Sequence, residues 1–162
     1  MPSPKIGVLP QKFADGKPAQ ASREFVHLVL ETAVLTGADK FGFYIVKFPD
    51  GLNVELSGAG LDGAGSFTGC AFHIRGMSPH LIKIILLVAK AGDLVILPAL
   101  ENVVPILTSL QQKLDLPSDL AQRSPGPVVC GSPGELEALL SGGYGGWRNY
   151  FHQALKKSGD VG

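Results

Sequence analysis

A glycine-rich segment, Gly58-Ala59-Gly60-Leu61-Asp62-Gly63, has the spacing of a dinucleotide-binding loop. In such a loop the glycines let a pyrophosphate approach the N-terminus of the helix that follows. Here more glycines and then a predicted strand follow, and Asp62 would place a carboxylate beside the phosphates. We therefore expect residues 58–69 to be a flexible connecting loop. A small enzyme, such as a transferase that uses this loop, is kept as an alternative function.

Nucleophilic catalysis needs a serine or a cysteine whose hydroxyl or thiol is activated by a histidine. The sequence contains the residue types of a catalytic triad, for example Ser78, His73 and Asp93. Triads are defined by geometry, however, and no sequence spacing indicates that these three residues lie together. The GxSxG motif of the α/β-hydrolases is missing. Cys70 lies in a predicted strand among small and apolar neighbours, which is typical of core packing. We therefore assign no catalytic residue and expect that the protein is not an enzyme.

The spacing of the histidines and cysteines is not that of a metal site. None of the four histidines forms an HxH, HxxxH or HExxH pair. Cys70 and Cys130 lie far apart in the sequence, so they form neither a CxxC pair nor a disulfide framework. We expect two free buried thiols, no metal and no cofactor.

Four residues are candidates for contacts with a partner. Residues 142–151 combine glycines with large aromatic rings and an arginine, as interface hot spots do. Within this segment we assign partner binding to Tyr144 and Arg148. Asp62 and Glu101 lie in predicted loops, which often carry binding groups, and they would suit a basic partner.

The composition argues against several kinds of partner. Hydrophobic residues make up 45% of the chain and charged residues 17%, below the typical share of about 25%. Lys plus Arg and Asp plus Glu are balanced at 14 each, without a basic cluster, so we expect neither nucleic-acid binding nor attachment to anionic lipid. The most apolar run, Leu81 to Ala99, is interrupted by charged residues, and the first residues lack the apolar core of a signal peptide. We therefore expect a cytoplasmic protein that does not cross a membrane.

The length of 162 residues fits one domain. Residues 1–20 are rich in proline and glycine and show no periodicity, which predicts an irregular N-terminal arm before a single domain over residues 21–162. This domain is expected to begin with a helix over 22–36, capped by Ser22. Residues at spacings of three and four predict the buried face of this helix: Phe25, Leu28, Val29, Thr32 and Leu35.

The central part of the chain shows clear strand and helix signals. Aromatic and β-branched residues predict a hairpin over 41–57 and a strand over 70–75. Ser78 and Pro79 begin the clearest helix, which Gly92 is expected to end. A strand follows directly.

The remaining elements are shorter. Pro105 opposes a helix over residues 101–108, so an edge strand is expected there, although the sequence leaves strand and helix open. A loop is expected over 116–127, and a last helix over 146–157 would bury Trp147, Phe151 and Leu155. Adjacent hairpins favour an α+β fold, with a mixed or mainly antiparallel sheet and helices packed on one face.

Residues 70–115 carry a family resemblance. The stretch Phe72-His73-Ile74-Arg75-Gly76-Met77-Ser78-Pro79-His80-Leu81, continued by Ala89 to Glu101, resembles small cytoplasmic immunity proteins encoded beside toxins of bacterial type VI secretion and polymorphic-toxin systems. The shared pattern is a strand, an apolar helix capped by Ser-Pro, a Lys-Ala-Gly-Asp exit and a second strand. The resemblance implies a stoichiometric inhibitor that masks a cognate toxin, often a nuclease, and it brings no catalytic residues with it.

The sequence is therefore compatible with three functions. The first is an immunity protein that neutralises its toxin by direct contact, although its neutral charge departs from the acidic character common among inhibitors of nucleases. The second is the small enzyme that uses residues 58–69. The third is a structural module that buries apolar surface against a second copy of itself, as in a homodimer.

Overall fold

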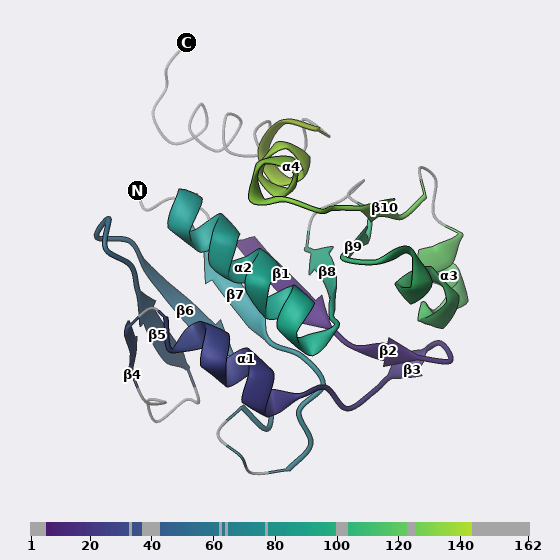
Figure 1. The fold of residues 1–162 in the computed structure, drawn as a ribbon, viewed down its shortest axis with the longest axis horizontal. Coiled ribbons are helices and arrows are strands. Elements are labelled where there is room, and N and C mark those ends of the chain that lie inside the picture. Colours follow the sequence, from purple (N-terminus) through teal and green to yellow (C-terminus); the bar gives the residue numbers. More distant parts are fainter. Residues whose placement is uncertain are drawn as a thin grey trace, which may run out of the picture.

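The chain folds into an α+β structure around one large sheet. The computed structural model describes residues 6–32, 34–36, 43–61, 63, 65–76, 78–99, 104–122 and 126–143. Eight strands form the sheet in the order β10-β9-β8-β1-β7-β6-β5-β4 (Figure 1). The strands are β1 (Ile6–Gln11), β4 (Val34–Thr36), β5 (Tyr44–Lys47), β6 (Asn53–Ser57), β7 (Ala71–Ile74), β8 (Val95–Pro98), β9 (Ile106–Leu107) and β10 (Val128–Val129). A separate small hairpin joins β2 (Phe13–Ala14) to β3 (Lys17–Pro18).

Neighbouring strands of the large sheet are antiparallel, except that β9 and β10 are parallel. Helices α1 (Arg23–Leu30) and α2 (Pro79–Gly92) lie side by side on one face of the sheet (Figure 1). Four shorter helical segments follow along the chain: η1 (Leu110–Asp115), α3 (Ser118–Ala121), α4 (Pro133–Glu137) and the π-helical turn η2 (Ala138–Gly143). The predicted fold class, a mainly antiparallel sheet with helices on one face, is confirmed.

Helix α2 forms the centre of the core. The Ser78 hydroxyl accepts a hydrogen bond from the Leu81 N–H at 3.1 Å, and Pro79 stands in the first turn, as predicted. The residue that leaves the helix in the left-handed region is Asp93, with φ 54°, and not Gly92. Aspartate is one of the few non-glycine residues that adopt this conformation readily. The Asp93 carboxylate is bound by Lys12 at 2.6 Å and by the Gln112 side-chain amide at 2.8 Å.

The N-terminal region differs from its prediction, because part of it forms a strand. Residues 6–11 form β1, which lies in the middle of the sheet between β7 and β8, so the predicted irregular arm over residues 1–20 is wrong for this segment. Val8 is 1% exposed. Pro10 fits an interior strand because it can still accept: its carbonyl takes the Cys70 N–H at 3.0 Å. The local composition does not indicate this strand, because β1 is stabilised by pairing with β7 and β8, which are distant in the sequence.

Helix α1 differs from its prediction in its length and in its buried face. It ends at Leu30, and residues 34–36 form β4, the edge strand that pairs with β5, so the predicted helix over 22–36 is too long. Its buried residues are Val26 and Leu30. Phe25 and Leu28, which were expected in the core, are exposed by 58% and 62%.

The segment around Pro105 also differs from its prediction. Ile106 and Leu107 form β9, which lies between β8 and β10, so β9 is an interior strand and not the predicted edge strand. Pro105 stands just before β9, where its carbonyl accepts from the Val128 N–H at 3.1 Å. The predicted loop over 116–127 contains the short helix α3.

Candidate functional site

The glycine-rich loop between β6 and β7 is anchored at several points to the body of the protein. The side chains of Leu61 and Phe67 are buried in the core. His27 on α1 donates its Nε2 hydrogen to the Leu61 carbonyl at 2.7 Å, since a carbonyl oxygen can only accept. The Ala21 N–H donates to the Phe67 carbonyl at 2.8 Å. The expectation of a flexible connecting loop is therefore corrected for the described residues of this segment.

Glycine at position 60 is required where the loop crosses itself. Gly60 has a φ of +79°, a region that side chains with a Cβ seldom adopt. A Cβ on this residue would lie 2.3 Å from the Ser66 carbonyl oxygen. The G-x-G-x-x-G spacing therefore has a local structural explanation, a tight crossing of the backbone, that needs no bound phosphate.

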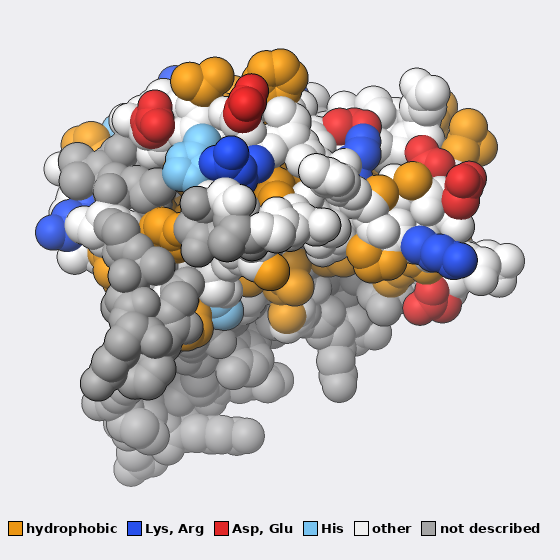
Figure 2. All heavy atoms as spheres, turned by 90° about the horizontal axis from the view of Figure 1, so that it is seen from below, with side chains coloured by type: hydrophobic (Ala, Val, Ile, Leu, Met, Phe, Trp, Pro, Cys, Tyr) orange, Lys and Arg blue, Asp and Glu red, His pale blue; other side chains and the backbone are white. Residues whose placement is uncertain are grey.

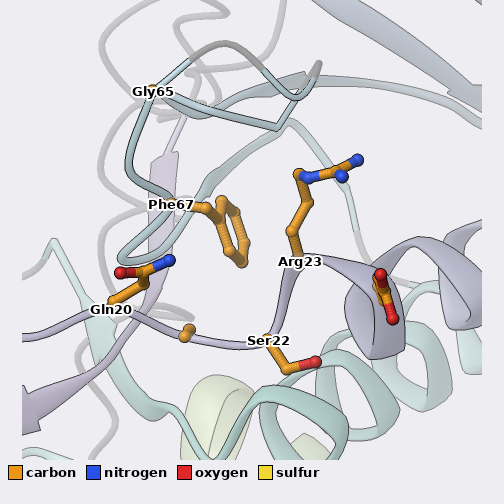
Figure 3. Close-up of a pocket in the computed structure, with 7 residues that line it drawn as sticks. Gln20, Ser22, Arg23, Gly65 and Phe67 are labelled. Atoms are coloured by element: carbon orange, nitrogen blue, oxygen red, sulfur yellow. The ribbon is translucent and has the colours of Figure 1, made fainter.

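A hollow of about 260 Å³ lies between this loop and the start of α1. Figure 3 shows the ring of Phe67 between Gln20 and Arg23, with Ser22 below them. Small-molecule sites usually have volumes of about 300–1,000 Å³ and mostly apolar walls, whereas this hollow is smaller and mostly polar. Its size fits a few water molecules or a single side chain better than a dinucleotide.

The outer side of α1 presents apolar and acidic residues to solvent. We define the α1 surface as Glu24, Phe25, Leu28 and Glu31, all exposed. A second, shallow hollow of about 370 Å³ lies along its edge, lined by Glu24, Leu28 and Glu31 of this surface and also by Arg23 and His27. Figure 2 shows apolar side chains beside acidic groups, a histidine and a basic side chain along this rim of the molecule. Exposed phenylalanine and leucine side chains that adjoin each other mark a surface that can bind a protein.

The α1 surface is held rigidly from behind. Val26 and Leu30, on the opposite side of the helix, have no exposed surface and pack with α2. Ser22 caps the first turn through a hydrogen bond from the Phe25 N–H at 3.3 Å. A surface fixed in this way loses little conformational entropy when a partner binds.

The four residues that the sequence nominated for partner binding lie outside the described residues. These are Tyr144, Arg148, Asp62 and Glu101, and the predicted helix over 146–157 is outside them as well. Their role in partner binding therefore stays a prediction.

Sequence reasoning missed the α1 surface because two apolar stripes run along the same helix. One has a spacing of three, Phe25 and Leu28, and the other a spacing of four, Val26 and Leu30. Either could face the core by periodicity alone. The direction in which the sheet lies decided between them.

The triad that can be written from the sequence does not form. Ser78 precedes α2 and Asp93 follows it, so a helix of 14 residues, about 21 Å long, separates them. His73 on β7 instead forms a hydrogen bond with the Ser57 hydroxyl at 3.0 Å, and the edge of its ring meets Phe43. Acyl transfer needs a third group that orients the histidine, in addition to a serine and a histidine. A hydrogen bond between polar side chains of neighbouring strands is also common in sheets without catalytic function.

The two cysteines are free and buried, as predicted. Burial raises the pKa of the Cys70 thiol to about 12, because a thiolate would be poorly solvated there. The pKa of Cys130 is raised for the same reason. A thiol that stays protonated at neutral pH is a poor nucleophile, so neither cysteine suits catalysis.

Over the described ranges, no group of three histidine, cysteine, aspartate or glutamate side chains is placed to hold a metal ion. None of the helices in that part of the chain has the length and apolar character that crossing a bilayer requires.

No family model, curated protein or solved structure matches the chain.

Proposed function

We propose that this protein is an immunity protein, which binds a cognate bacterial toxin in the cytoplasm and neutralises it by direct contact. The observation that carries the proposal is the α1 surface, where Phe25 and Leu28 are exposed by 58% and 62% on a helix whose other side is locked into the core. The resemblance of residues 70–115 to immunity proteins supports the same function. A nuclease is one candidate for the toxin.

The exposed apolar pair gives a physical reason for binding. Removing a large apolar side chain from water stabilises a complex by about 1.5–3 kcal/mol when burial is complete. Hot-spot residues lie near the centre of an interface, where the surrounding contacts exclude water, and this is the position that we expect for the pair. Because α1 is already ordered, binding does not incur the entropy cost of ordering this helix.

The enzyme alternative has less support. A transferase that used the glycine-rich loop would need a cleft beside it, and the hollow there measures about 260 Å³. The loop itself is filled from within by the buried side chains of Leu61 and Phe67.

The homodimer alternative uses the same apolar pair, since Phe25 and Leu28 could also pack against a second copy. Sedimentation at increasing protein concentration separates the two functions. A mass that stays monomeric favours a foreign partner, and a mass that doubles favours self-association.

The test is co-expression with the product of the neighbouring gene. We expect the wild-type protein to rescue cells from that product and to form a stoichiometric complex with it. Phe25→Ser and Leu28→Ser should each weaken the complex by about 2 kcal/mol, as hot-spot residues do. Leu114→Ser is the matched control, because Leu114 is 83% exposed on η1, away from the α1 surface. Absence of a complex, or equal loss in all three variants, would contradict the proposal.

The same complex tests the residues predicted from sequence. If Tyr144 and Arg148 are hot spots, Tyr144→Ala and Arg148→Ala should each weaken binding by about 2 kcal/mol. Unchanged affinity in both variants would remove them from the interface.

A further inference from the structure

We infer that the α1 surface selects a partner segment in which apolar side chains are flanked by lysine or arginine. This inference rests on the proposed function and names the chemistry of the partner. It follows from where the charges lie around the exposed apolar pair.

The acidic groups of the α1 surface form a row beside the apolar pair. Glu24 and Glu31 are seven residues apart, so they lie two turns apart on the same side of the helix, about 10 Å from each other along its axis. Leu28 lies next to this row, and Phe25 lies beyond Leu28, farther from the two carboxylates. A partner that covers the leucine must therefore meet both carboxylates.

Among the described residues, the basic side chains of α1 are Arg23 and His27, and both lie beside the glycine-rich loop. The Arg23 guanidinium lies 3.6 Å from the place that a Cβ on Gly63 would take. His27 is bonded to the Leu61 carbonyl at 2.7 Å. Arg23 also lines the hollow along α1, so its charge offsets part of the acidic charge there. On the side of Leu28, the charge that α1 offers to a partner is that of Glu24 and Glu31, although the whole chain is neutral.

This pattern disfavours two other occupants. Phosphates of a nucleic acid would be repelled by the carboxylates. In a symmetric dimer through this surface, the acidic rows of both copies would meet within one small patch, where like charges destabilise the contact. A basic and apolar protein segment has neither problem.

The spacing also limits the shape of the partner segment. Two cationic groups about 10 Å apart on one face fit residues seven apart on a helix. Apolar side chains between them would reach Phe25 and Leu28.

The first experiment reverses one charge and measures affinity for the product of the neighbouring gene. Glu31→Lys is the better position, because a lysine at the end of α1 does not oppose the helix dipole, as it would at Glu24. We expect the affinity to fall about tenfold at low salt and the difference to shrink at about 0.5 M NaCl. Asp119→Lys, on exposed α3, changes the net charge equally and should leave the affinity within about twofold of the wild type.

The second experiment does not depend on that gene product. Two synthetic amphipathic peptides carry the same leucines, flanked in one by lysines and in the other by glutamates. Only the lysine peptide should shift the amide NMR signals of α1, and Leu28→Ser should remove the shifts.

The outcomes separate this inference from the proposed function. If the gene product binds and Glu31→Lys behaves like Asp119→Lys, the charge inference is overturned and the immunity function stands. If the gene product does not bind, the immunity function fails, and the peptides decide the surface. Equal binding of both peptides, no binding of the lysine peptide, or shifts away from α1 overturn the inference.

Discussion

At the scale of single residues, burial decides what each chemical group can do. Cys70 could be read as a nucleophile from its side chain alone, yet the core around it holds the thiol in its neutral form. His73 and Ser57 share a hydrogen bond across β6 and β7, which occupies both groups. Phe25 and Leu28, by contrast, are in water, and that position makes them available to a partner.

The raised pKa of Cys70 predicts a loss of stability in alkali. Its pKa is about 12 in the folded protein against the ordinary value of 9.0. Between these values the unfolded chain loses the thiol proton and the folded chain keeps it, so the free energy of unfolding falls as the pH rises. Relative to Cys70→Ala, the wild type should lose about 1 kcal/mol per pH unit above about pH 9 in denaturant titrations. Parallel pH profiles of the two proteins would contradict this prediction.

At the scale of elements, the glycine-rich loop and α1 form one unit. The loop places buried side chains in the core and receives hydrogen bonds from α1 and from the segment before it. The α1 surface therefore depends on a loop that does not itself belong to that surface.

Two glycines of this loop give a matched comparison. Gly60 and Gly65 both have positive φ angles, so an alanine is strained at either position. A Cβ at Gly60 would meet the Ser66 carbonyl oxygen at 2.3 Å, whereas at Gly65 no heavy atom of another segment lies within 4 Å. Gly60→Ala should therefore lower the free energy of unfolding by about 1–3 kcal/mol more than Gly65→Ala. Thermal unfolding measures the difference, and equal losses would show that the crossing can relax.

At the scale of the whole molecule, β1 joins the two halves of the sheet. It pairs with β7 on one side and β8 on the other, so its removal would leave two separate groups of strands. Its residues alternate between the helix-covered face and the opposite face, as Val8 and Leu9 show.

This alternation predicts opposite results for neighbouring substitutions. Val8 is 1% exposed in the core, and Leu9 is 37% exposed on the other face. Val8→Asp should abolish folding, because an unpaired buried carboxylate costs several kcal/mol and the whole domain is stabilised by only about 5–15 kcal/mol. Leu9→Asp should remain folded with a modest loss, as circular dichroism and a cooperative melting curve can show. A folded Val8→Asp protein would mean that β1 is dispensable.

Features that arise within a few residues of each other could be predicted before the structure was known. Ser78 with Pro79 marked the start of α2, an aromatic and β-branched run marked β5, and alternation marked β6. Adjacent hairpins indicated a mainly antiparallel sheet. These signals survive because caps and alternating burial depend on local backbone geometry.

Which surfaces meet depends on contacts between segments that are far apart in the sequence. The sheet takes β1 into its middle although a proline and a glycine weaken its strand signal, because pairing with β7 and β8 supplies the missing stability. The side on which the sheet and α2 lie chose Val26 and Leu30 for the core and left Phe25 and Leu28 in solvent. Periodicity offers both stripes equally, and contact between distant segments is the physical difference between them.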